Sequence, residues 1–174
     1  MNYFQLFNLP AQFELDLAEL NSRYLKLQRQ FHPDKHSAGS ERDRLMAVQQ
    51  TANINDAYRS LKQPLLRAEH LLALRGLLID DEQRSFNEPM FLMQQMTLRE
   101  QLAEIKTAAD PDAVIDHVET ELQQAKKQLL VQLADALRQA KPEQDQQAAD
   151  LIRKLKFFYK LQHELEFIEQ QLKD

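Results

Sequence analysis

Prolines divide this chain into segments whose apolar residues recur at helical spacing. Pro33, Pro64, Pro111 and Pro142 each stand between two such segments, where a proline ends one helix or occupies the first turn of the next. Glycine is nearly absent, with 2 in 174 residues, and Leu, Ala, Gln, Glu and Lys are abundant. Because these residues favour helix and few positions interrupt it, we predict an all-α fold.

The sequence pattern in the N-terminal part of the chain predicts three helices. Asp16 is a candidate N-cap for the first, with Glu19 three residues further on. The second spans about residues 41–62, and a third over 64–75 begins at a proline and ends before Gly76. Each of the two longer helices carries one apolar stripe. The stripe residues are Leu17, Leu20, Tyr24, Leu27 and Phe31 in the first helix, and Ala47, Thr51, Ile54, Tyr58 and Leu61 in the second.

The helical periodicity breaks in the sequence LLIDDEQRSFNEP, which follows Gly76. Pro and polar residues cluster there, as they do in loops and linkers. We therefore predict an N-terminal domain over 1–75, a linker over 76–87 and a C-terminal domain over 88–174.

The sequence pattern in the C-terminal domain predicts three more helices, at about 88–107, 111–139 and 143–172. Each of the last two has one apolar stripe, so an antiparallel three-helix bundle is the expected packing. The stripe residues are Val114, Val118, Leu122, Ala125 and Leu129 in the first of these two helices, and Leu151, Leu155, Phe158, Leu165 and Leu172 in the second.

The tripeptide His32, Pro33, Asp34 predicts a stiff exposed corner at the end of the first long helix. Pro33 pushes His32 out of the helical region, so the helix must end there. Asp34 then offers acceptor oxygens suited to an arginine of a partner, and the His32 ring can donate or accept. Most isolated tripeptides of this kind are only a helix stop before a polar loop. Here a basic helix face precedes the corner, and its residues are Arg23, Lys26 and Arg29.

A second apolar stripe distinguishes the predicted helix over 88–107. Its core stripe consists of Phe91, Leu98, Leu102 and Ile105. The second consists of Leu92, Met96 and Ala103, roughly 100° to 140° around the helix from Phe91. Phe157 lies to the side of the main stripe of the last helix in the same way. These residues form either a wide face buried under the N-terminal domain or an apolar surface patch for a partner.

Composition excludes several classes of site. The chain has 0 cysteines, so it has no disulfide, thiolate nucleophile or thiolate metal ligand of its own. Two glycines are too few for a phosphate-binding loop, and no catalytic arrangement can be argued, so we predict that the chain is not an enzyme and needs no cofactor or metal. The start of the chain has no secretory signal, and no apolar run is long enough to span a membrane. We expect a cytoplasmic protein that binds neither membrane nor nucleic acid.

Residues 1 to about 75 resemble a J-domain, the module through which J-proteins stimulate ATP hydrolysis by DnaK-type chaperones. The chain is more similar still to the HscB-type co-chaperones of iron–sulfur cluster assembly. This similarity rests on the segments NYFQLFNLP, LQRQFHPDKH and QQTANINDAYRSLKQPLLRAEHLL. The similarity continues through FLMQQMTLREQL and LIRKLKFF, so it covers essentially the whole chain.

The resemblance implies two interfaces. One implied partner is an HscA-type chaperone ATPase, bound by an antiparallel hairpin of the two long N-terminal helices; the implied contact residues are His32, Pro33, Asp34, Arg23, Lys26, Arg29 and Lys35. The other is an iron–sulfur scaffold protein of the IscU type; the implied contact residues are Leu92, Met93, Met96, Arg99, Glu100 and Phe157. Gln94 and Thr97 stand where such proteins often have acidic residues, so less charge is expected at this interface.

Two alternative functions stay open from the sequence. One is a general folding co-chaperone whose C-terminal bundle binds unfolded clients, although the Gly/Phe-rich linker and Cys-rich repeats of general DnaJ proteins do not occur here. The other is a homodimerisation bundle whose second apolar stripe is the self-interface.

Overall fold

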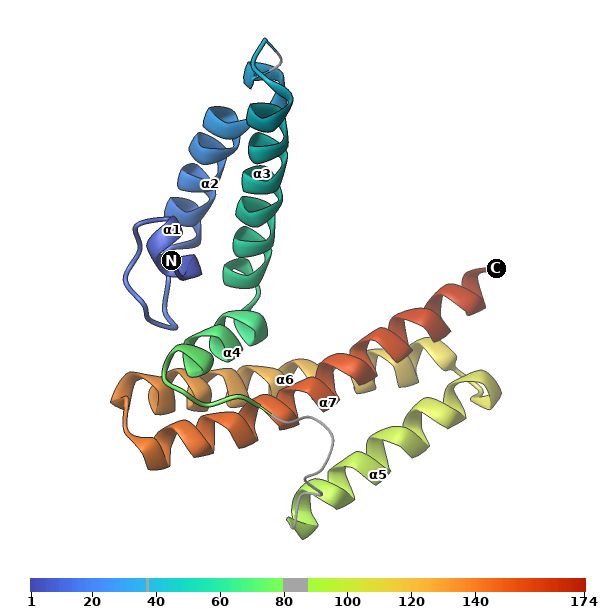
Figure 1. The fold of residues 1–174 in the computed structure, drawn as a ribbon. Coiled ribbons are helices and arrows are strands. Elements are labelled where there is room, and N and C mark those ends of the chain that lie inside the picture. The colour runs from blue at the N-terminus through green and yellow to red at the C-terminus, as the bar shows by residue number, and fades with distance from the viewer. Residues whose placement is uncertain (37, 80–87) are drawn as a thin grey trace. The chain divides into compact units, whose positions relative to one another are not determined.

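The computed structural model describes residues 1–36, 38–79 and 88–174. The described residues contain helices and turns but no strand, so the prediction of an all-α fold is confirmed. They form two compact units, Met1–Leu78 and Ile79–Asp174 (Figure 1). The predicted linker over 76–87 falls largely on residues 80–87, which lie outside the described residues.

Unit 1 is built around an antiparallel hairpin of two helices, α2 (Leu17–Phe31) and α3 (Glu41–Lys62) (Figure 1). Asp16 caps α2 as predicted, because its side chain accepts hydrogen bonds from the backbone N–H groups of Ala18 and Glu19. The short helix α4 (Pro64–Leu74) follows α3. Gly76, at φ +86°, closes α4 by adopting the left-handed conformation that glycine tolerates best.

The hairpin is held by a small apolar core and a stacked tyrosine pair. Leu20, Ile54 and Leu61 are fully buried. The rings of Tyr24 and Tyr58 stack with centroids 3.9 Å apart, and each hydroxyl donates to an asparagine of the opposite helix. One stripe prediction is wrong, because Leu17 is exposed in the first turn of α2. Tyr24, Leu27 and Phe31 of the same stripe are half-buried.

The aromatic N-terminus forms a helix that periodicity alone did not predict, α1 (Tyr3–Leu6). Asn2 and Gln5 make a capping box, in which each side chain accepts a hydrogen bond from the other residue's backbone N–H. Phe4 and Phe7 are buried, which anchors α1 in unit 1.

Arg67 on α4 joins three segments of unit 1. Its guanidinium donates to the carbonyl oxygens of Phe13 (2.6 Å) and Leu61 (2.7 Å) and lies over the Phe13 ring. The buried cation thus satisfies carbonyl groups of the loop before α2 and of the last turn of α3, which would otherwise be costly to bury.

His70 on α4 contacts the N-terminal helix α1. Its Nε2 accepts a hydrogen bond from the Tyr3 backbone N–H (3.3 Å), and its ring stacks on that of Tyr3 (4.5 Å between centroids). Burial lowers the pKa of His70 below its ordinary value. The unfolded chain therefore takes up this proton more readily than the folded chain.

We expect the free energy of unfolding to decrease as the pH falls below about 6.5, where an exposed histidine begins to be protonated. The His70→Gln variant should show a smaller decrease, because an amide can accept from Tyr3 without titrating. Urea unfolding of both proteins between about pH 8 and pH 5 measures this difference. Parallel curves for the two proteins would show that His70 does not contribute.

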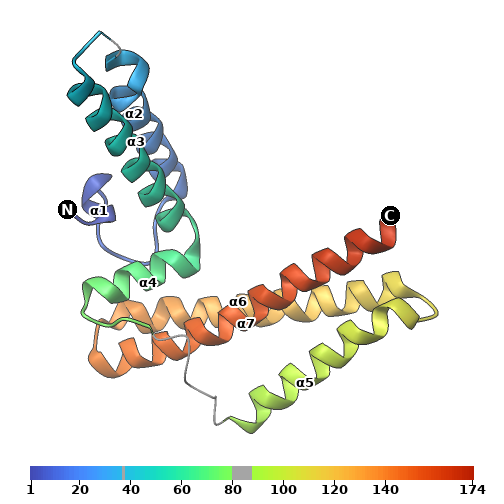
Figure 2. The same cartoon turned by 45° about the vertical axis from the view of Figure 1, so that its right-hand side comes forward.

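Unit 2 is a three-helix bundle of α5 (Pro89–Glu104), α6 (Pro111–Gln139) and α7 (Pro142–Lys173), with a 3-10 turn over Ile105–Thr107. Figures 1 and 2 show α6 and α7 side by side and antiparallel, with α5 converging on them at its C-terminal end. Lys154 on α7 pairs with Glu88 before α5 (2.5 Å), which ties the start of α5 to the bundle.

The core stripe predicted for the helix over 88–107 is confirmed, since all four of its residues are buried: Phe91, Leu98 and Leu102 lie on α5, and Ile105 lies in the 3-10 turn after it. The other members of this core come from α6 and α7: Ile115, Val118, Leu122, Phe158, Leu161 and Leu165. Leu172 is a wrong prediction, because the last turn of α7 leaves that side chain exposed. Val114 is only partly buried, because neighbouring Ile115 takes the central position at the start of α6.

Candidate functional site

The His32, Pro33, Asp34 corner is a turn at the tip of the unit 1 hairpin. His32 has an extended backbone (φ −59°, ψ 133°), as its position before proline predicts, and α2 ends at Phe31. A 3-10 turn over Pro33–His36 begins directly after it. The Phe31 carbonyl accepts from the Thr51 hydroxyl (3.0 Å), so the end of α2 is fixed against α3.

The side chains of the corner lie on the surface but are locally ordered. His32 Nδ1 accepts a hydrogen bond from the Asp34 backbone N–H (3.2 Å), so the neutral imidazole carries its proton on Nε2. The Asp34 carboxylate lies 3.5 Å from the same Nδ1, and its side chain is 91% exposed. A partner can therefore reach the Asp34 carboxylate without moving the backbone of the corner.

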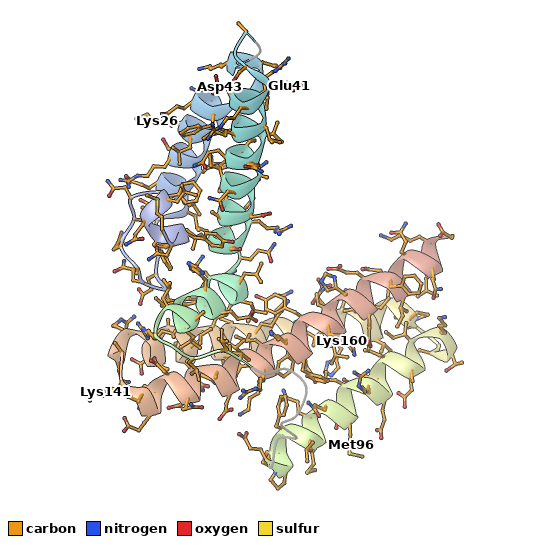
Figure 3. All side chains as sticks on the ribbon, viewed as in Figure 1. Lys26, Glu41, Asp43, Met96, Lys141 and Lys160 are labelled. Carbon is orange, nitrogen blue, oxygen red and sulfur yellow. The ribbon has the colours of Figure 1, made fainter. Side chains whose placement is uncertain are left out.

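Exposed basic side chains lie along α2 and beside this corner. Lys26, Arg29 and Lys35 are exposed and make no ion pair with any residue in the described ranges. Figure 3 shows Lys26 projecting from α2 away from α3. A hollow of about 330 Å³ lies between Arg29, Lys35 and the corner, and a second of about 370 Å³ lies between Lys26 and the start of the chain. The α2 face thus presents positive charge beside shallow recesses.

Arg23 is placed differently from the other basic residues of α2. Its guanidinium donates to the carbonyl oxygens of Phe7 and Asn8 and pairs with Glu19 (2.5 Å). These bonds hold the loop after α1 against α2. Arg23 therefore adds positive charge to this face but has fewer donors for a partner than Lys26 or Arg29.

The second apolar stripe of α5 is a surface. Leu92, Met93 and Met96 are 43%, 63% and 63% exposed, whereas Phe91 and Leu98 of the core stripe of the same helix are buried. Figure 3 shows Met96 on the side of α5 that faces away from α6 and α7. Leu92, Met93 and Met96 are called the α5 apolar face below. Glu100 and Ala103 are exposed on the next turn of this face.

Phe157 on α7 contacts α5 through Phe91 and Arg99, and it belongs partly to the core. It is half-buried, and its ring makes edge contacts with Phe91 (5.7 Å) and Phe158 (5.3 Å). Arg99 covers the ring at 5.6 Å and pairs with Glu164 of α7 (3.3 Å). The structure thus brings Arg99 and Phe157 together, and it gives both a role within the bundle.

Two surface features escape the sequence reasoning. Leu45, Met46 and Val48 are exposed on α3, opposite the stripe that packs on α2. In unit 2, Met90 and Lys154 border a hollow of about 480 Å³ between the start of α5, α6 and α7. A count of apolar residues on the outer face of α3 could have found the exposed residues of α3. The hollow in unit 2 depends on the angle between α5 and the α6–α7 pair, which the sequence pattern does not give.

Lys126 and Tyr159 form a buried contact between α6 and α7. The Lys126 ammonium lies 5.0 Å from the Tyr159 ring centroid. Burial lowers the pKa of Lys126, against the opposing effect of Glu166 and Glu119, and burial raises the pKa of Tyr159. This contact is best described as helix packing.

No group of three or more metal-ligating side chains gathers in the part of the chain that the structure describes. Within the same residues, none of the helices has the length and apolar character needed to cross a bilayer.

Comparison with known proteins identifies this arrangement. A family model described as the HSCB C-terminal oligomerisation domain matches residues 87–166. The chain is 51% identical over 172 residues to a co-chaperone protein HscB homolog of Vibrio cholerae and 48% identical to one of Shewanella loihica, with 99% of each chain covered.

Solved structures agree. The chaperone HscB of Vibrio cholerae superposes with a TM-score of 0.86 at 50% identity, covering 99% of both chains. The human co-chaperone HscB superposes with a TM-score of 0.88 at 27% identity, covering 97% of this chain and 82% of that one.

These relatives belong to a class of co-chaperones, which are not enzymes. The chain belongs to the HscB family of co-chaperones, and the predicted resemblance is confirmed. A co-chaperone of this family acts with a chaperone.

Proposed function

We propose that this protein is a cytoplasmic adaptor that holds an IscU-type iron–sulfur scaffold on unit 2 and presents it to an HscA-type chaperone ATPase bound by unit 1. The observation that carries the proposal is the pairing of an exposed Asp34 corner on one unit with an exposed apolar face on the other. Family membership supports it, because relatives that are named co-chaperones match the chain over nearly its whole length.

The α2 face supplies the proposed contact with the chaperone. His32, Pro33 and Asp34 dock as a preformed corner, and a partner arginine donates to the Asp34 carboxylate. Lys26, Arg29 and Lys35 meet acidic groups of the partner, while Arg23 mainly keeps the neighbouring loop in place.

The α5 apolar face supplies the proposed contact with the scaffold. Leu92, Met93 and Met96 bury their exposed side chains, and Glu100 orients the complex from the rim. Arg99 and Phe157 support the face by packing behind it as well as touching the partner.

The reaction itself is phosphoryl transfer in the partner. A co-chaperone accelerates it only by binding the hydrolysis-competent conformation of the ATPase more tightly than the resting one. Holding the scaffold at the same time raises its effective concentration at the chaperone's peptide site. Because the chain has no cysteine, its own residues are poorly suited to ligate the cluster.

A two-part experiment tests this function with the full-length chain. Calorimetric titration measures binding of an IscU-type scaffold, and single-turnover ATP hydrolysis by an HscA-type chaperone measures stimulation. We expect saturable scaffold binding, and stimulation that increases when scaffold is present. Binding of unfolded clients in place of the folded scaffold would support a general folding co-chaperone.

The basic face of α2 leads to a prediction about ionic strength. Stimulation of the ATPase should weaken as salt rises, because screening reduces attraction between exposed charges. Lys26→Glu should slow association with the chaperone by roughly threefold to tenfold at low salt and change dissociation little. Stopped-flow binding measures both rates, with Lys141→Glu in unit 2 as the matched charge reversal. A change confined to dissociation would contradict the expectation that Lys26 acts mainly by attracting the partner during association.

Self-association of unit 2 is a second candidate function. It is favoured by the description of the matched family model as an oligomerisation domain. Analytical ultracentrifugation of the full-length chain over a range of concentrations tests it. If a dimer forms and the scaffold dissociates it, scaffold binding and self-association use the same α5 apolar face. If the dimer binds the scaffold and stays a dimer, the two functions use different surfaces.

A further inference from the structure

All five methionines of this protein lie on its surface. Met1, Met46, Met90, Met93 and Met96 are each at least 58% exposed. Methionine is ordinarily among the residues most often buried, so a chain with none in its core is unusual. With 0 cysteines, these thioethers are also the side chains of this protein most readily oxidised.

Two of the five methionines lie within the α5 apolar face, and the others do not. Met93 and Met96 are one turn apart beside Leu92. Met90 lies further around α5, where it borders the hollow lined by Gln94 and Lys154. Met46 is on α3 in unit 1. The chain therefore contains exposed methionines both inside and outside the proposed docking surface.

We propose that Met93 and Met96 are a reversible oxidation site that switches off docking on the α5 apolar face, an inference that rests on the proposed function. Hydrogen peroxide is the oxidant. The thioether sulfur attacks one peroxide oxygen, and an S–O bond forms as the O–O bond breaks. The departing hydroxide takes the proton of the sulfur-bound hydroxyl group to become water. The sulfur loses two electrons and becomes a sulfoxide, and methionine sulfoxide reductases reverse the step with electrons from thiols.

The same exposure that admits the oxidant protects the fold. Met93 and Met96 are 63% exposed, so a sulfoxide at either position is hydrated in the free protein and does not disturb the core. In a complex the added oxygen is buried against a partner surface that was complementary to an apolar side chain. A buried polar group without a hydrogen bond weakens binding by about tenfold or more.

The experiment compares scaffold binding before and after peroxide treatment of the full-length chain, with the peroxide removed before titration. Peptide mass spectrometry locates the sulfoxides. We expect the Kd for an IscU-type scaffold to rise by at least about tenfold in the oxidised protein. Treatment with methionine sulfoxide reductases should restore the Kd as the sulfoxides at Met93 and Met96 disappear.

Matched variants assign the effect to particular residues. A Met93→Leu, Met96→Leu variant keeps an apolar surface of similar size. Whatever its Kd before treatment, that Kd should not change after peroxide, because neither side chain can form a sulfoxide. A Met46→Leu, Met90→Leu variant should remain sensitive. Circular dichroism should show no change in helix content or thermal unfolding on oxidation.

Three results would overturn the inference, and they differ from one another. Full affinity after oxidation of Met93 and Met96 removes the switch but leaves the proposed function intact. The loss of affinity must come from another residue or reaction if reductase treatment does not reverse it. The same conclusion follows if the Met93→Leu, Met96→Leu variant also loses affinity after peroxide. Failure of the untreated protein to bind scaffold overturns the proposed function, and the switch with it.

Discussion

We expect the Asp34→Asn variant to lose most of its ability to stimulate ATP hydrolysis by the chaperone partner. The substitution keeps the size of the side chain but removes its charge and one of its acceptor oxygens. Loss of a charge-assisted hydrogen bond should weaken the contact by about 1.5 to 3 kcal/mol. Because the Asp34 side chain is 91% exposed, the free energy of unfolding should stay close to that of the wild type.

The same variant separates the two interfaces. Asp34 belongs to unit 1 and the α5 apolar face to unit 2, so scaffold affinity should be unchanged. Pro33→Ala should resemble Asp34→Asn, because α2 can then continue past His32 and the corner is lost. Asp56→Asn is the matched control, since Asp56 lies in an exposed ion pair with Arg59 on α3, away from the corner.

Single-turnover ATP hydrolysis and calorimetric titration of the scaffold measure the two effects on each variant. Full stimulation by Asp34→Asn would mean that the corner only ends α2 and does not contact the chaperone through the Asp34 carboxylate. Loss of scaffold binding in the same variant would contradict the division of labour between the units.

Replacing Leu92 and Met96 together by alanine should reduce scaffold affinity by about a hundredfold or more. Apolar side chains at the centre of an interface commonly contribute about 2 kcal/mol each. Both side chains are exposed in the free protein, so the loss of unfolding free energy should stay within about 0.5 kcal/mol for each. Calorimetric titration and urea unfolding measure the two quantities on one preparation.

The chain supplies a chemically identical control. Leu45 and Met46 on α3 are exposed to a similar degree, and replacing both by alanine removes the same atoms from unit 1. Scaffold affinity should not change in this control. An equal loss of affinity in both double variants would mean that apolar surface in general, and not the α5 apolar face, binds the partner.

Phe157→Ala is expected to behave differently from the Leu92 and Met96 substitutions. Its ring contacts Phe91 and Phe158 at the edge of the unit 2 core, so truncation should lower stability as well as affinity. A half-buried aromatic of this kind should cost about 1 to 3 kcal/mol of unfolding free energy. The variant therefore reports on both roles of the residue at once.

Helix boundaries are predictable from this sequence where a proline marks them. The predicted range 111–139 coincides with α6, and α7 begins at Pro142, one residue before its predicted start. The four-residue helix α1 is too short to show a period, and its only sequence signal is the capping pair Asn2 and Gln5.

The candidate site was predictable to the level of helix faces. Spacing along α5 separates Met96 from the buried Leu98 without knowledge of the neighbouring helices. The sequence could not reveal that Arg23 on α2 donates to the Phe7 and Asn8 carbonyls, because backbone acceptors carry no sequence signature. For the same reason the contact of Arg99 with Phe157 depends on how α5 meets α7, which spacing within either helix does not specify.

The stacked Tyr24 and Tyr58 rings give this protein a built-in optical probe. The chain has no tryptophan and four tyrosines, so tyrosines dominate its near-ultraviolet circular dichroism. Tyr24, Tyr58 and Tyr3 all lie in unit 1, two of them in close ring contact, whereas Tyr159 alone represents unit 2. Near-ultraviolet spectra therefore follow mainly the hairpin, while far-ultraviolet spectra follow all the helices. A melting experiment recorded at both wavelengths would reveal whether the two units unfold together or in sequence, without any added label.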